Sequence, residues 1–264
     1  MPKLAANLST MFTDAPFLER FGRAARAGFK AVECQFPYGF DPDDIAAELE
    51  RNGLTMALFN LPPGDLAAGE RGLASLPEAR DRFRESLDPA LRHALATGCR
   101  QLHCMAGVLS GPATPAEREA AFVDNLRAAS ALFWPHRIRL LIEPLNPFDT
   151  PNYFLGSVEQ AAGIVEKAGV DGVGIQYDFY HQSRTRGELV ATFDRFRGLI
   201  GHVQIAGNPG RHEPDSGEVD YGFVLRALDE RGYAGFVGCE YVPAGDTEAG
   251  LGWARQWLEA GPAA

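Results

Sequence analysis

Four polar residues, each at or near the end of a short apolar run, have the types and positions to do chemistry together. Glu143 closes LLIE, Asp178 closes GIQYD, Gln204 lies within HVQIA, and Glu240 closes VGCE. Three carboxylates crowded into a partly dry site would repel one another and take up protons unless a cation neutralised them. Because all four side chains offer oxygen ligands, they suit one divalent metal ion, Mg²⁺ or Mn²⁺, better than a metal that prefers thiolates. We therefore expect a shared metal site with open positions for a substrate that has two adjacent oxygens.

The elements that would position these residues repeat along the chain. Eight β-type runs alternate with helical stretches, and at five of the joins a Gly ends the helix just before the next run. Gly in that place takes the left-handed conformation that closes the last helical turn, and the recurrence of this join is typical of βα units. The five glycines are Gly28, Gly53, Gly98, Gly169 and Gly232. The expected strands lie near residues 3–8, 30–35, 54–60, 100–105, 138–143, 173–178, 201–206 and 236–241.

Eight βα units in 264 residues predict an α/β protein with a single (β/α)8 TIM barrel, one domain that spans residues 1–264. The carboxyl ends of all strands then meet at one mouth, so that the side chains ending the last four strands can converge. A doubly wound sheet is the alternative, but it would offer one crevice rather than a ring of strand ends. Two connections are unusually long, residues 61–77 and the loop after the seventh run, and we interpret both as candidate lids.

Local signals also mark helix starts. Thr114 and Glu117 have the spacing of a capping box around Pro115, and Asp41 before Pro42 is a typical acidic N-cap. Both signals precede stretches with helical composition, which supports the alternation of strands and helices.

Bulk composition narrows the choice of function. A net charge of −10 argues against a nucleic-acid partner, because binding phosphates requires a basic surface. No apolar run approaches the roughly 20 residues that span a bilayer, and the N-terminal stretch has no secretory apolar core, so we expect a cytoplasmic protein with no membrane partner. The four cysteines show no CxxC spacing and are interpreted as free thiols. A homo-oligomer is considered because barrels of this kind often associate, but the sequence alone does not locate an exposed apolar stripe.

Five motifs carry a resemblance to a known family. They are GERGLA at residues 69–74, IEPLN at 142–146, YDFYH at 177–181, HVQIAGNPGRHEPDSGEVDY at 202–221 and GCEYVP at 238–243. With these motifs and this length, the chain resembles the xylose isomerase-like barrels and, among them, the hydroxypyruvate isomerases. GERGLA and the Gln of the fourth motif, in place of the His of sugar epimerases, favour this branch. The neighbouring 2-oxo-tetronate isomerases share nearly all of these motifs.

The resemblance implies a ligand set and a reaction. The metal ligands would be Glu143, Asp178, Gln204 and Glu240. Glu143 and Glu240 would donate and accept the proton that moves between adjacent carbons when hydroxypyruvate and tartronate semialdehyde interconvert. The metal would hold the carbonyl and hydroxyl oxygens side by side and stabilise the cis-enediolate as a Lewis acid. The expected partner is therefore a small hydroxy-oxo acid.

Three further residues are expected to bind the substrate: His181, Arg211 and Arg71. His181 and Arg211 follow the sixth and seventh runs at offsets where related sugar epimerases contact their substrates, although a loop histidine that caps a helix is the alternative for His181. An α-keto acid needs a clamp for its carboxylate, and the guanidinium of Arg offers a bidentate fork. This favours Arg211, with Arg71 as a second clamp, while Glu70 beside it has the alternative of pairing with a neighbouring helix.

Three other polar residues receive lesser roles. Asp149 follows Glu143 by six residues and is a candidate for supporting the site from outside it. Glu33 and His103 end or lie on earlier strands and could line the mouth, but no motif marks them. We therefore interpret both as structural.

Other functions use the same kind of barrel. A ketose 3-epimerase would employ the same metal and the same two acids on free ketoses, and an inosose-type dehydratase is disfavoured by the Gln ligand. An endonuclease with several zinc ions needs more His than the six present, together with a basic groove. A barrel that only binds a metal or ligand would not require two uncommitted acids beside an open metal position.

Overall fold

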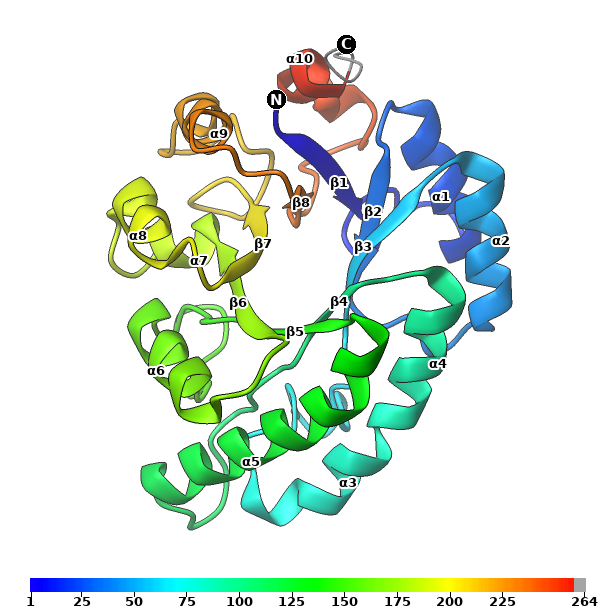
Figure 1. Ribbon diagram of the computed structural model, residues 1–264. Coiled ribbons are helices and arrows are strands. Elements are labelled where there is room, and N and C mark those ends of the chain that lie inside the picture. Colours follow the sequence, from blue (N-terminus) through cyan, green and yellow to red (C-terminus); the bar gives the residue numbers. More distant parts are fainter. Residues whose placement is uncertain (259–264) are drawn as a thin grey trace.

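The strands form one sheet that closes on itself. In the computed structural model, which describes residues 1–258, eight parallel strands pair in chain order and β8 returns to pair with β1 (Figure 1). A closed sheet leaves no unpaired edge, and the arrangement confirms the predicted (β/α)8 TIM barrel. The strands are β1 Lys3–Asn7, β2 Ala31–Cys34, β3 Thr55–Asn60, β4 Gln101–His103, β5 Arg139–Ile142, β6 Val173–Asp178, β7 Ile200–Ile205 and β8 Phe236–Cys239.

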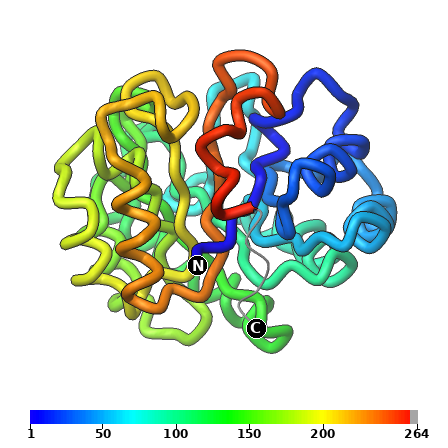
Figure 2. The backbone as a smooth tube through the Cα atoms, turned by 90° about the horizontal axis from the view of Figure 1, so that it is seen from above, coloured from blue at the N-terminus to red at the C-terminus, as the bar shows by residue number. Residues whose placement is uncertain are grey.

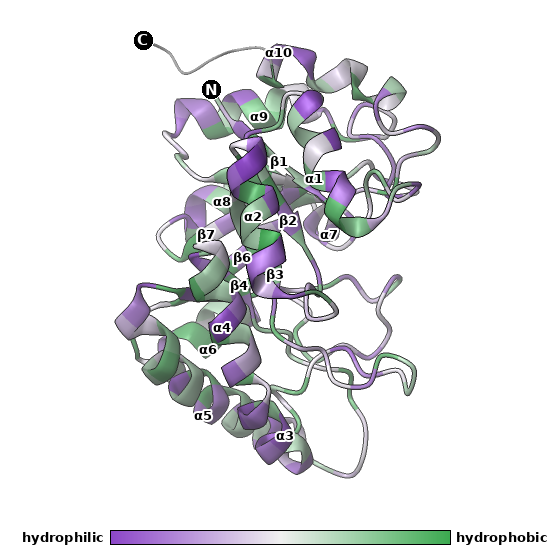
Figure 3. Ribbon diagram, turned by 90° about the vertical axis from the view of Figure 1, so that its right-hand side faces the viewer, coloured by the Kyte–Doolittle hydropathy of each residue, from purple (hydrophilic) through white to green (hydrophobic). Residues whose placement is uncertain are grey.

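Helices surround the barrel and connect its strands (Figures 1 and 2). Their ribbons carry both hydrophobic and hydrophilic residues, as expected of helices that cover a sheet with one face and meet water with the other (Figure 3). The α-helices are α1 Phe17–Arg26, α2 Pro42–Asn52, α3 Arg80–Glu85, α4 Leu87–Thr97, α5 Pro115–Phe133, α6 Val158–Ala168, α7 Phe179–Ser183, α8 Leu189–Phe196, α9 Tyr221–Glu230 and α10 Arg255–Leu258. Within residues 1–258, the short 3₁₀ helices are η1 Pro77–Ala79, η2 Trp134–His136 and η3 Ala249–Ala254.

The predicted helix boundaries are confirmed. At α5 the Thr114 side chain accepts a hydrogen bond from the backbone N–H of Glu117, whose carboxylate accepts one from the N–H of Thr114. At α2 the Asp41 carboxylate accepts from the N–H of Asp43. Three of the predicted glycines take the left-handed conformation that ends α2, α4 and α6: Gly53, Gly98 and Gly169. These local bonds satisfy backbone groups that a helix end otherwise leaves unpaired.

Polar side chains occupy part of the barrel interior. Alternate residues of a strand share a face, and on β6 and β7 the residues Gln176, His202 and Gln204 are at most 2 % exposed. Glu33 of β2 is completely buried among them. The large apolar core joins strands and helices instead. The sequence predicts a structural role for Glu33 and a ligand role for Gln204, but not that the two form one buried cluster with Gln176 and His202.

Two long loops at the mouth are each pinned by a neighbouring loop. In the 61–77 loop, Gly72 forms an antiparallel bridge with Ala106, and a Cβ on Gly72 would lie 2.3 Å from the Met105 carbonyl oxygen. In the loop after β7, the backbone carbonyl of Arg211 accepts a hydrogen bond of 2.8 Å from the N–H of Val242. Arg211 has a φ of +57°, which a residue with a side chain keeps only where its surroundings fix it.

The chain ends and the helix lengths complete the description. β1, near the N-terminus, lies beside α10, so that the first and last described elements are neighbours (Figures 1 and 2). Within residues 1–258, none of the helices combines the length and the apolar character that crossing a membrane requires. The four cysteines are buried free thiols, as predicted.

Candidate active site

A cavity opens at the carboxyl ends of the strands. Its volume is about 390 Å³, which is in the range of small-molecule sites. Five of the residues predicted from the sequence line it: Arg71, Glu143, His181, Arg211 and Glu240. The other lining residues are Gln35, Phe36, Asn60, Leu66, His103, Met105, Leu145 and Thr150.

The three predicted acids lie where the strand-end pattern places them. Glu143 directly follows β5, Asp178 ends β6, and Glu240 directly follows β8. Their exposed fractions are only 4 %, 3 % and 7 %. A carboxylate oxygen of Glu143, one of Asp178 and a ring nitrogen of His181 all lie within 4.8 Å of one another. The barrel thus brings two acids to one point and sets a His beside them.

Arg211 joins the third acid to this group. Its Nη2 donates to Glu240 Oε2 at 2.8 Å and lies 3.8 Å from Asp178 Oδ2. The other oxygen of Glu240 accepts from the side-chain amides of Asn7 at 3.3 Å and Gln35 at 3.1 Å. Glu240 is therefore held by three donors. The guanidinium predicted to clamp a substrate carboxylate here pairs with a carboxylate of the protein.

Burial disfavours the simultaneous ionisation of these three acids. Burial raises the pKa of Glu143 well above its usual range, and the neighbouring Glu240 and Asp178 add to the shift. Burial also raises the pKa of Asp178 to about 7, although Arg211 opposes the change. For Glu240, burial raises the pKa while Arg211 again acts in the opposite direction. A bound cation would lower all three pKa values.

His181 has a fixed proton position. Its Nδ1 accepts hydrogen bonds from both the backbone N–H of Asn146, at 3.2 Å, and the side-chain amide of Asn146, at 2.7 Å. That amide cannot turn round freely, because its oxygen accepts two backbone N–H groups of the same loop. We assign the ring proton to Nε2, which lies 3.7 Å from Asp178 Oδ2. Burial, aided by the charge of Arg211, lowers the pKa of His181 well below its usual value. A neutral imidazole therefore offers an N–H donor at the cavity.

Gln204 lies inside the barrel rather than on the cavity wall. Its Nε2 donates to Glu33 Oε1 at 2.7 Å, and its Oε1 accepts from Gln176 Nε2 at 2.6 Å. In the sheet, Gln204 is the register partner of Asp178. The fourth predicted ligand thus lies beside Asp178 in the sheet. Its side-chain amide is hydrogen-bonded at both ends.

The available donors fit a divalent cation. Among the residues that the structure describes, Glu143 Oε1 and Asp178 Oδ2 are buried without a hydrogen-bond partner. A buried carboxylate oxygen is costly unless a proton, a donor or an ion satisfies it. Glu240 would share its carboxylate between a cation and its three present donors. Oxygen donors of this kind suit Mg²⁺ or Mn²⁺, whereas the Nε2 proton disfavours His181 as a ligand.

Arg71 is presented to the cavity by the 61–77 loop. Its Nη1 donates to the backbone carbonyls of Leu66 at 3.2 Å and Glu70 at 2.8 Å. Glu70 itself pairs with Arg82 of α3 at 2.6 Å, which is the alternative weighed for it from the sequence. The loop's own backbone therefore orients the Arg71 guanidinium.

His103 and Asp149 contribute to the site in ways that the sequence did not specify. His103 Nδ1 lies 3.6 Å from Glu143 Oε2 on the cavity wall, and burial lowers the pKa of His103 to about 3, so that this imidazole is neutral. Asp149 accepts from the Asn146 amide at 3.0 Å and from the Tyr180 hydroxyl at 2.8 Å. It thereby supports the residue that orients His181.

Three amide residues at the site were missed. Asn7 ends β1, Asn60 ends β3, and Gln35 directly follows β2. Gln35 and Asn60 line the cavity, and Asn7 and Gln35 bind Glu240. Each has the same strand-end position that identified the acids, so that signal would have found them had it been applied to the first three strands.

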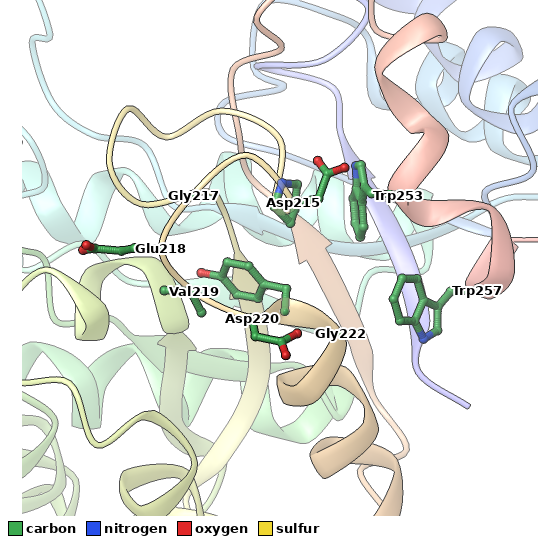
Figure 4. A pocket seen from close by; sticks show the side chains of 10 residues that line it. Asp215, Gly217, Glu218, Val219, Asp220, Gly222, Trp253 and Trp257 are labelled. Atoms are coloured by element: carbon green, nitrogen blue, oxygen red, sulfur yellow. The ribbon is translucent and has the colours of Figure 1, made fainter.

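A second hollow shares no lining residue with this cavity. It has a volume of about 470 Å³, and the loop before α9 contributes Glu218 and Asp220 while the C-terminal segment contributes Trp253 and Trp257 (Figure 4). Its lining contains none of the three buried acids. The smaller cavity at the strand ends is therefore the candidate active site.

Known proteins resemble this chain over nearly its whole length. A sequence model of the family described as "Xylose isomerase-like TIM barrel" matches residues 21–260. The chain is 45 % identical over 259 residues to the 2-oxo-tetronate isomerase of Pectobacterium atrosepticum, covering 98 % of this chain and 99 % of that protein. It is 42 % identical over 253 residues to the hydroxypyruvate isomerase of Escherichia coli K12, covering 96 % and 98 %. A solved structure described as an AP endonuclease, family 2, from Brucella melitensis has a TM-score of 0.95 and 47 % identity, covering 97 % of this chain and 99 % of that one.

Proposed function

Because this chain belongs to the xylose isomerase-like TIM barrel family, we propose that its cavity isomerises a small 3-hydroxy-2-oxo acid. The chain is an isomerase of the kind for which its relatives are named. In the proposed reaction the carbonyl moves from carbon 2 to carbon 3. One proton moves from carbon 3 to carbon 2, and the hydroxyl proton moves from the oxygen on carbon 3 to the oxygen on carbon 2. Hydroxypyruvate, which would give tartronate semialdehyde, is the three-carbon substrate of this kind.

The proposal rests on Glu143 and Glu240, two buried acids at the cavity. They have different hydrogen-bond partners, so one is suited to hold a proton and the other to accept one. Three donors, from Arg211, Asn7 and Gln35, stabilise the ionised form of Glu240. Glu143 has an oxygen with no partner among the described residues, and burial raises its pKa well above the usual range. This difference in hydrogen-bond partners assigns Glu240 as the base that takes the proton from carbon 3 and Glu143 as the acid that delivers one to carbon 2. In the reverse direction the two exchange roles.

Neighbouring side chains would stabilise the negative charge that develops between these proton transfers. The intermediate is a cis-enediolate, whose two oxygens carry that charge. His181 Nε2–H is a neutral donor at the cavity and would bind one of them. A divalent cation held by Glu143, Asp178, Gln204 and Glu240 would supply the Lewis acidity that stabilises both.

The carboxylate of the substrate needs a separate partner. Arg211 is already paired with Glu240, whereas Arg71 reaches the same cavity from the 61–77 loop. Its hydrogen bonds run through Nη1 to backbone carbonyls, and no bond from its Nε or Nη2 is found in residues 1–258. We therefore assign Arg71 as the clamp for the substrate carboxylate.

2-Oxo-tetronate is a second candidate substrate. It carries the same oxo and hydroxyl groups on adjacent carbons with one further carbon, and a relative 45 % identical to this chain is named for it. The 47 % identity to a protein described as an endonuclease does not favour a nucleic-acid substrate here. A net charge of −10 and a cavity of about 390 Å³ suit a small molecule better than a polyanionic duplex.

The test compares both acids as substrates in deuterated water. The protein is stripped of metal, Mg²⁺ or Mn²⁺ is returned, and hydroxypyruvate, 2-oxo-tetronate and a free ketose are followed by proton NMR. We expect metal-dependent turnover of an oxo acid and none of the ketose. Glu240→Gln should lose both turnover and exchange of the carbon 3 proton. At saturating metal, Glu143→Gln should lose turnover but keep that exchange, because the base Glu240 is intact.

The control is Glu48→Gln, the same change on α2 outside the barrel, which should behave as wild type. Near wild-type turnover in both active-site variants would contradict the proton-transfer roles. Turnover of the ketose alone would indicate a 3-epimerase, and metal binding without any exchange of substrate protons would indicate a binding protein.

A further inference from the structure

We propose that Glu33 is a positioning residue, which turns the amide of Gln204 so that its oxygen faces the metal site. The inference rests on the proposed function, because it presumes that Gln204 is a metal ligand. It assigns a role to a buried acid that the reaction itself does not use.

Glu33 is the centre of the polar group inside the barrel. Its carboxylate is completely buried, yet it makes three close polar contacts. Oε1 accepts from Gln204 Nε2 at 2.7 Å and from Asn7 Nδ2 at 3.0 Å, while Oε2 lies 2.7 Å from His202 Nε2. A buried carboxylate with this many partners has one well-defined place.

Strand β8, the hydrogen-bonded neighbour of β7, leaves room for the Glu33 carboxylate. Gly238 on β8 is the register partner of Gln204, and a Cβ built on it would lie 2.2 Å from Glu33 Oε2. Any residue other than Gly would therefore displace the carboxylate. The volume that β8 leaves empty is the volume in which the Glu33 carboxylate lies.

This carboxylate decides which end of the Gln204 amide faces which way. A carboxylate accepts hydrogen bonds but donates none, so it can bind the NH₂ of an amide and repels the oxygen. With Nε2 bound to Glu33, the Gln204 oxygen must point to the other side, where it meets Gln176 Nε2 at 2.6 Å. Gln176 and Asp178 are two residues apart on β6 and share a face. The oxygen is thus directed toward the strand that carries an acid of the proposed metal site.

The bond to Gln176 is one that a cation can replace. Among the described residues, Gln176 Oε1 is buried without a partner, so nothing fixes this second amide from its other end. The amide of Gln176 is therefore the weaker neighbour of Gln204, and the carboxylate of Glu33 is the stronger one. If a cation binds the Gln204 oxygen, the bond to Glu33 can stay in place.

The Glu33 carboxylate is also linked to Glu240 through the side-chain amide of Asn7. Asn7 Nδ2 donates both to Glu33 Oε1 at 3.0 Å and to Glu240 Oε1 at 3.3 Å. Asn7 Oδ1 is turned away and accepts from the N–H of Ser9 at 3.0 Å. One buried acid therefore orients an amide ligand on β7 and an amide that holds Glu240 after β8.

A double-mutant cycle on Mn²⁺ affinity tests the inference. Glu33→Gln keeps the size of the side chain but lets Gln204 face either way, so the affinity measured by calorimetry should fall roughly 10- to 100-fold, as loss of such partners does at other sites. In a Gln204→Glu background the ligand has two equivalent oxygens and needs no orientation. There, Glu33→Gln should leave Mn²⁺ affinity unchanged or increase it, because it also removes the repulsion between two acids.

The cycle separates positioning from a merely structural role. A structural role for Glu33 predicts weaker binding in both backgrounds, and that outcome would overturn the inference. Equal Mn²⁺ affinity of Glu33→Gln and wild type would overturn it too, whereas a wild type that binds no Mn²⁺ would overturn the proposed function itself.

Two further variants complete the test. Glu48→Gln is the acid-to-amide control outside the barrel and should keep wild-type affinity. If Glu33→Gln alone does not fold, the test uses the double variant Glu33→Gln, Gln204→Glu. This variant keeps one carboxylate–amide pair, with the carboxylate now at position 204 and the amide at position 33. Binding of Mn²⁺ by the double variant within a few-fold of wild type supports the inference, and loss of binding overturns it.

Discussion

Asn146 decides which nitrogen of His181 carries the proton, because its backbone and side-chain N–H groups both donate to Nδ1. A metal ligand needs a lone pair. Ligation through Nε2 would therefore require the proton to move to Nδ1 and both bonds from Asn146 to break. His181 lies within 4.8 Å of oxygens of Glu143 and Asp178, yet its chemistry is that of a donor. Proximity alone would have assigned it to the metal.

Replacement of His181 separates these two roles. His181→Phe removes the Nε2–H donor and keeps a ring of similar size. We expect kcat/KM to fall roughly 100-fold, as when one donor to a developing oxyanion is lost, while Mn²⁺ affinity measured by calorimetry stays within a few-fold of wild type. Asp178→Asn is the companion variant that removes a proposed ligand and should weaken Mn²⁺ binding. A His181→Phe protein that loses Mn²⁺ binding as strongly would show that the ring is a ligand after all.

Single residues also show what the sequence can and cannot predict about the site. Glu143, Asp178 and Glu240 were predictable because each interrupts an apolar run at the point where a strand ends. Glu33 and His202 lie within such runs and come together from β2 and β7, a pairing of 2.7 Å that only the closed barrel creates. Arg211 was predicted at the mouth, but its pairing with Glu240 depends on how two loops meet.

At the scale of elements, the 61–77 loop is positioned by the close contact of Gly72 with the loop after β4. Gly72 has a φ of +101°, and its backbone lies against the Met105 carbonyl of the next loop. Arg71 is its immediate neighbour, so the contact that fixes the loop also fixes the proposed carboxylate clamp. The length of the loop marked it as a candidate lid in the sequence. Its point of attachment could not be predicted, because that depends on the loop after β4.

Two glycines in this loop allow the close approach to be tested on its own. Gly69 and Gly72 both have positive φ, but a Cβ on Gly69 meets nothing within 4 Å. Gly69→Ala should cost only the backbone penalty, roughly 1–2 kcal/mol of unfolding free energy. Gly72→Ala should cost a further ~1–3 kcal/mol from the clash and raise KM for the oxo acid, because Arg71 moves. Urea unfolding and steady-state kinetics measure both effects, and equal KM values in the two variants would contradict the link between Gly72 and the clamp.

At the scale of the whole molecule, the closed barrel sets the electrostatics of the site. Helix starts, terminal glycines and apolar runs were sufficient to predict eight βα units, since each is a local signal. Closure then forces the ends of β5, β6 and β8 to one mouth, and no local signal reports the resulting burial. The raised pKa values of Glu143, Asp178 and Glu240 are a consequence of the fold as a whole. In the metal-free protein, ionising these buried acids should therefore lower the free energy of unfolding, by an amount that depends on pH.

Replacement of Asp178 allows this loss of unfolding free energy to be measured. Its pKa rises from 3.8 to about 7 on folding, chiefly through burial, so the folded protein binds this proton more tightly than the unfolded chain does. The free energy of unfolding must then fall as pH rises from about 4 toward 7. Asp178→Asn removes the ionisation, so in the presence of chelator its stability relative to wild type should increase by on the order of 2 kcal/mol between about pH 5.5 and 7.5. Added Mn²⁺ should raise the melting temperature of wild type more at the higher pH, because the cation competes with protons. Thermal unfolding of both proteins at the two pH values measures this, and a stability difference that does not change with pH would show that Asp178 is already ionised in the metal-free fold.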